Sequence, residues 1–100
     1  MNKDVYREAY ERANGVCEIC GSNNMVECHH IIHGKGKRTQ CETVDAVIFL
    51  CWEHHHGTNG IHGYNGHELD FKLKLELQKK YTENYPTMDL KTLMGGRFYW

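Results

Sequence analysis

The chain has 100 residues, of which 40% are hydrophobic and 25% are charged, a composition typical of one small globular domain and not of a disordered chain. Its formal net charge is −1, so no overall basic field attracts nucleic acid, and such binding would need a local patch or a metal ion. No apolar run approaches the roughly 20 residues of a membrane span, so we expect no membrane partner.

The N-terminal segment, residues 1–16, is predicted to form a short amphipathic helix. Its apolar residues recur every four positions, at Val5, Ala9 and Ala13. Asn2 or Asp4 can cap its start, and Asn14-Gly15 is a left-handed stop signal. The same segment lacks the apolar stretch of a secretory signal, so we expect a cytoplasmic protein.

The middle of the chain, residues 17–62, contains all the cysteines and all but one of the histidines. Residues 25–32 and the apolar run at 46–50 are predicted to be strands. Glycines and charges predict a loop at residues 33–40. Residues 57–66 are too rich in glycine and asparagine to form a regular helix or strand.

Residues 67–85 return to a helical period and carry an apolar stripe. The stripe consists of Leu69, Leu73, Leu77 and Tyr81, widened by Phe71 and Leu75. Pro86 is expected to end this helix. A last helical turn over residues 88–94 is predicted to stop at Gly95-Gly96, before an aromatic tail. We expect the outer helices to pack on the core, with binding to a partner protein as the alternative.

The chain contains five cysteines and eight histidines. A domain of this length has a thin core and usually needs disulfides or a structural metal. An odd number of cysteines in a cytoplasmic setting argues against a disulfide framework. Cysteine combined with histidine in a reduced compartment indicates zinc.

Two short motifs provide the ligands for a zinc ion. Cys17 and Cys20 form a CxxC followed by glycine, and Cys51 and His54 repeat the spacing with histidine in the last place. Together they would make a closed Cys3His site of the structural type. His56 is an alternative fourth ligand, and Cys51 could instead be a buried cysteine at a strand end.

The remaining histidines outnumber the needs of a small core. His29 and His30 are adjacent on a predicted strand, so their side chains should point to opposite faces and not bind one ion together. One could hold a metal while the other deprotonates a water molecule, because imidazole titrates near neutral pH. Cys28 alternates with these histidines and is expected in the core, whereas Cys41 has no assigned role.

The ordered set of motifs resembles the HNH endonuclease family, in particular its zinc-containing ββα-metal members and small phage-encoded HNH proteins. The resemblance rests on the CxxC-Gly, on ECHHII at residues 27–32, on the Gly/Lys loop, and on the apolar run into LCWEHH at 50–55. It covers residues 13–81 and is strongest at 17–34 and 47–63.

The resemblance implies an α+β fold: a small zinc-stabilised ββα-metal domain, treble-clef-like, with flanking N- and C-terminal helices. The whole chain, residues 1–100, would be a single HNH-like domain with its core at 13–81 and a C-terminal helical extension at 67–100. Cys17, Cys20, Cys51 and His54 match the family's structural zinc ligands.

The same resemblance implies a second, catalytic divalent metal, which could be Mg²⁺, Mn²⁺, Ni²⁺ or Zn²⁺. His29 and His55 match its ligands, and His30 matches the general base that activates water to attack a phosphodiester. The family's usual third histidine would fall at Asn59, so His62 is a later candidate ligand. DNA is the implied substrate, and a second copy of the chain or a phage protein is a further implied partner.

One position departs from the family pattern. The central asparagine of the motif should precede residues 50–51, where Asp45 is the only polar candidate. Asp45 could coordinate the catalytic metal, or it could cap or salt-bridge the loop. Lys35, Lys37 and Arg38 lie on the loop after the first strand and would contact phosphates, although a solvated turn is the plain alternative.

These observations lead to a metal-dependent DNA endonuclease that uses a histidine base, with phage DNA processing as its setting by resemblance. An inactive HNH-like zinc module that binds DNA or a protein is the main alternative, because the motif asparagine is missing. A metal-storage or metal-sensing protein is a third hypothesis, which the motif order of the histidines disfavours. No segment resembles a base-reading helix, so sequence preference would come from partners or DNA shape.

Overall fold

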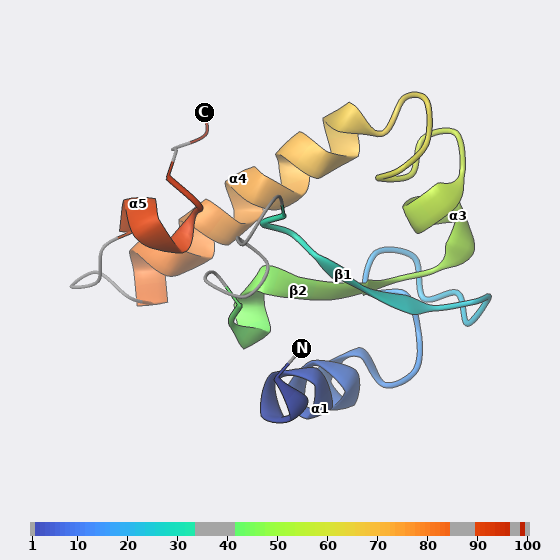
Figure 1. The fold of residues 1–100 in the computed structure, drawn as a ribbon. Coiled ribbons are helices and arrows are strands. Elements are labelled where there is room, and N and C mark those ends of the chain that lie inside the picture. Colours follow the sequence, from blue (N-terminus) through green and yellow to red (C-terminus); the bar gives the residue numbers. More distant parts are fainter. Residues whose placement is uncertain (1, 34–41, 85–89, 97–98, 100) are drawn as a thin grey trace.

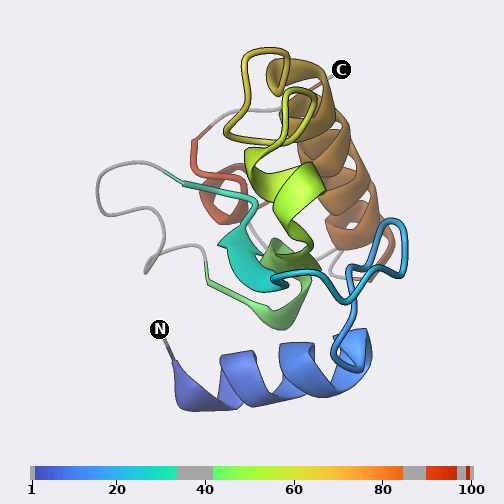
Figure 2. The same ribbon diagram turned by 90° about the vertical axis from the view of Figure 1, so that its right-hand side faces the viewer.

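A computed structural model describes residues 2–33, 42–84, 90–96 and 99 (Figure 1). It is a small α+β structure with a two-stranded antiparallel sheet and surrounding helices. The elements are α1 (Lys3–Ala13), β1 (Glu27–His30), the short 3-10 helix η1 (Val44–Ala46), β2 (Val47–Leu50), α3 (Trp52–His56), α4 (His67–Asn84) and α5 (Leu90–Leu93). In both views α1 lies on one side of the strands and α4 on the other (Figure 2).

Helix α1 is shorter at both ends than the predicted segment, because its two caps define it. The Asn2 side chain accepts hydrogen bonds from the backbone N–H groups of Asp4 (2.8 Å) and Val5 (3.2 Å). Asn14 adopts the left-handed conformation with φ 55° and ends the helix, as predicted. The buried face of α1 packs against Val47 and Phe49 of β2.

Strands β1 and β2 confirm the two predicted strands in shortened form, with Glu27 opposite Leu50 and His30 opposite Val47. Just beyond β1, the N–H of Ile31 donates to the carbonyl of Ala46 (2.8 Å), and Ile31 and Ile32 are buried against α4. Ahead of β2, Ala46 belongs to η1, which the Thr43 side chain caps. The sheet is therefore short, and the residues that flank it fill the core.

Helix α4 confirms the predicted C-terminal helix. Leu73, Leu77 and Tyr81 are buried, and Leu69 packs at their edge. Phe71 does not widen this stripe, because it is 41% exposed. Two residues along a helix correspond to a rotation of about 200°, so Phe71 lies on the face opposite Leu69 and Leu73.

Helix α5 and Tyr99 pack against α4. Helix α5 is shorter than the predicted turn, and it ends before Gly95 and Gly96, which have φ 78° and 100°. Tyr99 is held by two backbone hydrogen bonds with the Gln78 side chain (2.7 and 2.8 Å). Pro86, the start of the predicted turn and the other aromatic tail residues lie outside the described residues. None of the described helices is both long and apolar enough to cross a membrane.

Candidate metal centres

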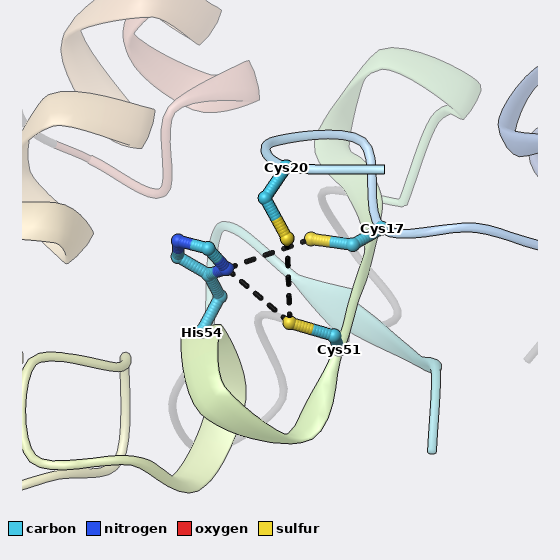
Figure 3. A group of neighbouring side chains, drawn as sticks. All are labelled: Cys17, Cys20, Cys51 and His54. Atoms are coloured by element: carbon cyan, nitrogen blue, oxygen red, sulfur yellow. Dashed lines mark hydrogen bonds between the residues drawn. The ribbon is translucent and has the colours of Figure 1, made fainter. Parts of the chain in front are cut away.

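The two halves of the predicted zinc site meet in space. Cys17 and Cys20 lie on the turn that follows α1, Cys51 lies at the junction of β2 and α3, and His54 lies on α3 (Figure 3). The Nδ1 atom of His54 is 3.3 Å from Sγ of Cys51 and 3.7 Å from Sγ of Cys17, and the Sγ atoms of Cys20 and Cys51 are 3.7 Å apart. All four candidate ligand atoms lie within 4.8 Å of one another.

The backbone shapes the first half of this cluster into a tight knuckle. Gly21 donates a hydrogen bond to the carbonyl of Cys17 (2.9 Å), and the N–H of Cys17 donates to Ser22 (2.8 Å). Gly21 has φ 79°, a conformation that favours glycine. The sequence CxxC-Gly therefore turns both thiols toward the same side.

The neighbouring thiols of Cys17 and Cys20 have pKa values shifted in opposite directions. Burial pushes the pKa of Cys17 up, but hydrogen bonds from backbone N–H groups, that of Cys51 first, leave this pKa below its ordinary value. The backbone hydrogen bond from Ser22 lowers the pKa of Cys20, but burial and the neighbouring thiols raise it above the ordinary value. A bound cation would allow all the thiols of the cluster to ionise together.

Three thiolates and one imidazole are the donor set of closed, tetrahedral zinc sites. This cluster, which we call the Cys3His site, could therefore hold a metal ion, and its donors are consistent with zinc. Cys51 is buried at the end of β2, but its Sγ also contacts the other donors, so it is a candidate ligand and not only a core residue. The alternative ligand His56 instead lies 2.9 Å from a Glu27 oxygen.

A second group of donors consists of imidazoles alone. His29 on β1, His55 on α3 and His62 on the following loop have candidate ligand atoms within 4.8 Å of one another. Their ring centroids are separated by 5.3 Å (His29–His55), 5.6 Å (His29–His62) and 4.7 Å (His55–His62). We call this group the three-histidine cluster.

His29 is the most buried member of the three-histidine cluster. Its Nε2 atom is buried and has no hydrogen-bond partner among the described residues. Burial, reinforced by the neighbouring His55 and His62, lowers the pKa of His29 to about 3. Burial also lowers the pKa of His55, against the opposing effect of Glu27. Neutral imidazoles of this kind have lone pairs available for a divalent cation.

The loop after α3 explains why His62 joins the cluster. Its backbone folds back on α3, with the N–H of Ile61 donating to His54 (2.9 Å) and the N–H of His62 donating to His55 (2.8 Å). A Cβ atom at Gly63 would collide with the carbonyl oxygen of Gly57, so this close approach depends on glycine. Of the two further candidate ligands, the structure therefore brings His62 to the cluster.

Asp45, the other candidate, does not join the three-histidine cluster. It lies in η1 and borders a separate small cavity together with Arg12 and Ile31. Lys35, Lys37 and Arg38, the predicted phosphate contacts, lie outside the described residues, as does Cys41.

His30 borders the same cavity, of about 200 Å³, as the three-histidine cluster. Its Nε2 lies 2.8 Å from Oε2 of Glu42, and both side chains are mostly buried. His33 also borders this cavity, and its Nε2 lies 3.3 Å from Asp70 on α4. The cavity therefore combines a candidate cation site with two imidazoles, His30 and His33, that belong to none of the donor groups found among the described residues.

Cys28 also lines the cavity wall but packs in part against the α1 and β2 cluster, in agreement with its predicted core position. Burial raises the pKa of its thiol to about 11, so Cys28 is a neutral thiol. It is therefore a poor nucleophile or metal ligand.

Sequence reasoning missed two carboxylates, Glu27 and Glu42. Glu27 lies 3.3 Å from Nδ1 of His55 and also pairs with His56, and these three residues form a further possible donor group. Strand alternation offered a signal for Glu27, because it precedes His29 by two residues and shares its face. Glu42 approaches His30 through tertiary structure and left no local signal.

A scan of protein-family models and searches of curated proteins and solved structures found no match to this chain.

Proposed function

We propose that the protein is a metal-dependent endonuclease of the HNH type, with a ββα-metal fold, that hydrolyses phosphodiester bonds of DNA. The observation that carries the proposal is the cavity where His30 borders the three-histidine cluster. A base and a cation site side by side are what hydrolysis of a phosphodiester requires. Two strands followed by a helix, β1, β2 and α3, carry His29, His30 and His55, and this order supports the resemblance to the ββα-metal motif.

Each histidine has a distinct role in the proposed reaction. His29, His55 and His62 hold the divalent cation, which when bound supplies positive charge beside the scissile phosphate. His30 accepts a proton from water while the water oxygen bonds to phosphorus. The bond from phosphorus to the 3′ oxygen breaks, and the 3′ oxygen takes a proton from solvent.

The Cys3His site supports this chemistry from a distance. Cys51 and His54 begin α3, and His55 is the next residue of that helix. A zinc ion on the Cys3His site would lock the knuckle to α3 and thereby fix the direction of His55. Lys35, Lys37 and Arg38 are proposed to contact the DNA backbone.

An inactive HNH-like zinc module that binds DNA or a protein is the second candidate. One observation favours it: Asp45, the only polar candidate for the position of the motif asparagine, lies outside the three-histidine cluster. The module would retain the Cys3His site but would not cleave DNA.

Nicking of supercoiled plasmid by the zinc-loaded protein distinguishes the two candidates. We expect wild type to produce open-circle or linear DNA with Mg²⁺, Mn²⁺ or Ni²⁺, and EDTA to stop the reaction. His30→Ala should lower the rate by about 100-fold or more, as expected for loss of a general base. His67→Ala is the matched control, because His67 is exposed at the start of α4 and outside the cavity.

Metal analysis must show one zinc ion per chain in each variant. No cleavage by folded, zinc-loaded wild type with any cation would contradict the nuclease and favour the binding module. Equal cleavage rates of His30→Ala and His67→Ala would contradict the role of His30 as the general base.

A further inference from the structure

Glu42 is a nearly buried carboxylate that is held from two sides. Its side chain is 9% exposed. Its Oε1 atom accepts a hydrogen bond from the backbone N–H of Asn2 (2.7 Å), and its Oε2 lies 2.8 Å from Nε2 of His30. The next residue, Thr43, is anchored by a hydrogen bond with the Tyr81 hydroxyl. Contacts with the start of α1 and with α4 therefore fix Glu42 in place.

The charge of Glu42 determines which nitrogen of His30 carries the proton. Burial pushes the pKa of Glu42 up, but the hydrogen bonds from His30 and the Asn2 N–H outweigh it and hold this pKa below its usual range. A carboxylate can only accept hydrogen bonds. The His30 nitrogen beside it, Nε2, must therefore be the N–H donor, which leaves the lone pair on Nδ1 in the neutral ring.

We propose that Glu42 is the positioning residue of the general base: it keeps the proton of His30 on Nε2 and presents the lone pair of Nδ1 to the cavity. This inference rests on the proposed function, in which His30 deprotonates the attacking water. The water proton passes to Nδ1, the Nε2–H stays bonded to Glu42, and the imidazolium that forms lies beside a carboxylate.

Glu42→Gln tests this role with little change of shape. The amide offers one acceptor and one donor where the carboxylate offers two acceptors. The Asn2 N–H can bond only to the amide oxygen, so the NH₂ group faces Nε2 of His30. That arrangement forms a hydrogen bond only if the His30 proton moves to Nδ1, and this tautomer cannot accept a proton from water at Nδ1.

Nitrogen-15 NMR of histidine-labelled, zinc-loaded protein reads the tautomer directly, with the His30 signals identified from His30→Ala. We expect the proton on Nε2 in wild type and on Nδ1 in Glu42→Gln. In plasmid cleavage, kcat of Glu42→Gln should fall about 100-fold, while KM stays within about twofold because DNA contacts are unchanged.

Asp70→Asn is the matched control, because it removes a carboxylate from another histidine at the same cavity, His33. We expect this control to leave both the His30 tautomer and kcat unchanged. A wild-type proton on Nδ1, or an unchanged tautomer in Glu42→Gln, would overturn the role of Glu42 whatever the cleavage assay shows. If Glu42→Gln moves the His30 proton to Nδ1 but the wild-type protein never cleaves DNA, the role of Glu42 toward His30 is supported and the proposed nuclease function is refuted.

Discussion

At the scale of single residues, the surroundings of each imidazole determine what it can do. His29 has a buried nitrogen with no partner among the described residues, and burial disfavours its protonated form. His30, one residue later, has a carboxylate partner. The two neighbours border the same cavity but differ in chemistry because only His30 is paired with a carboxylate. A metal ligand needs a neutral imidazole with an unpartnered nitrogen, as His29 has, and a general base is helped by a carboxylate partner, as His30 has.

Glu27 provides a prediction at this scale. Its oxygen lies 3.3 Å from Nδ1 of His55, the arrangement in which a carboxylate orients a metal-ligating imidazole. We expect Glu27→Gln to weaken binding of the second divalent cation about 10- to 100-fold. Isothermal titration of zinc-loaded protein with Ni²⁺ or Mn²⁺ measures this affinity.

His56→Ala serves as the control, because His56 is the other partner of Glu27 but lies outside the three-histidine cluster. It should leave the cation affinity unchanged. A comparable loss of affinity in His56→Ala would place the cation among Glu27, His55 and His56 instead, and would contradict our assignment.

At the scale of elements, local signals predicted much of the structure. The caps of α1, both strands and α4 follow from side-chain caps and apolar periodicity. The Cys3His site also follows from spacing, because each CxxC-like half is only four residues long and is positioned by one turn. The prediction that Phe71 widens the apolar stripe is wrong, because its offset of two residues from Leu69 and Leu73 places it on the opposite face of the helix.

The remaining site residues depend on tertiary contacts that spacing does not encode. The family spacing favoured Asn59 as the position of the third ligand, but the loop folds back on α3 and brings His62 to His55. Glu42 reaches His30 only because Asn2 and Tyr81, from both ends of the fold, hold its segment. Sequence patterns predicted which cysteines and histidines gather in the two clusters, but not the carboxylates, Glu27 and Glu42, that pair with the histidines.

The loop after α3 yields a prediction for this scale. Gly63→Ala places a methyl group against the carbonyl of Gly57, so the loop must move and carry His62 with it. We expect a loss of unfolding free energy of about 1–3 kcal/mol and weaker binding of the second cation, with zinc retained. Urea unfolding and cation titration measure the two effects.

Gly15→Ala provides the comparison, since a Cβ at Gly15 meets no atom within 4 Å and only its positive φ is strained. It should lower stability without changing cation affinity. Unchanged cation affinity in Gly63→Ala would show that the close loop packing does not position His62.

At the scale of the whole molecule, two candidate metal centres share the short helix α3, and the proposed function divides a structural and a catalytic role between them. A metal ion on the Cys3His site would join the knuckle after α1 to the start of α3 and would compensate for a core that is split between the two sides of a short sheet. The three-histidine cluster borders a cavity that His30 also lines. Since His54 and His55 are adjacent, one short helix carries ligands of both candidate metal centres.

The most direct test of this division is plasmid cleavage by protein that carries one zinc ion per chain, before and after a second cation is added. We predict no cleavage with the single zinc, cleavage once Mn²⁺ or Ni²⁺ is added, and no response from zinc-loaded, folded His29→Ala. Cleavage by the one-zinc protein that persists in His29→Ala, or no cleavage by wild type with any second cation, would contradict the assignment of a catalytic cation to the three-histidine cluster.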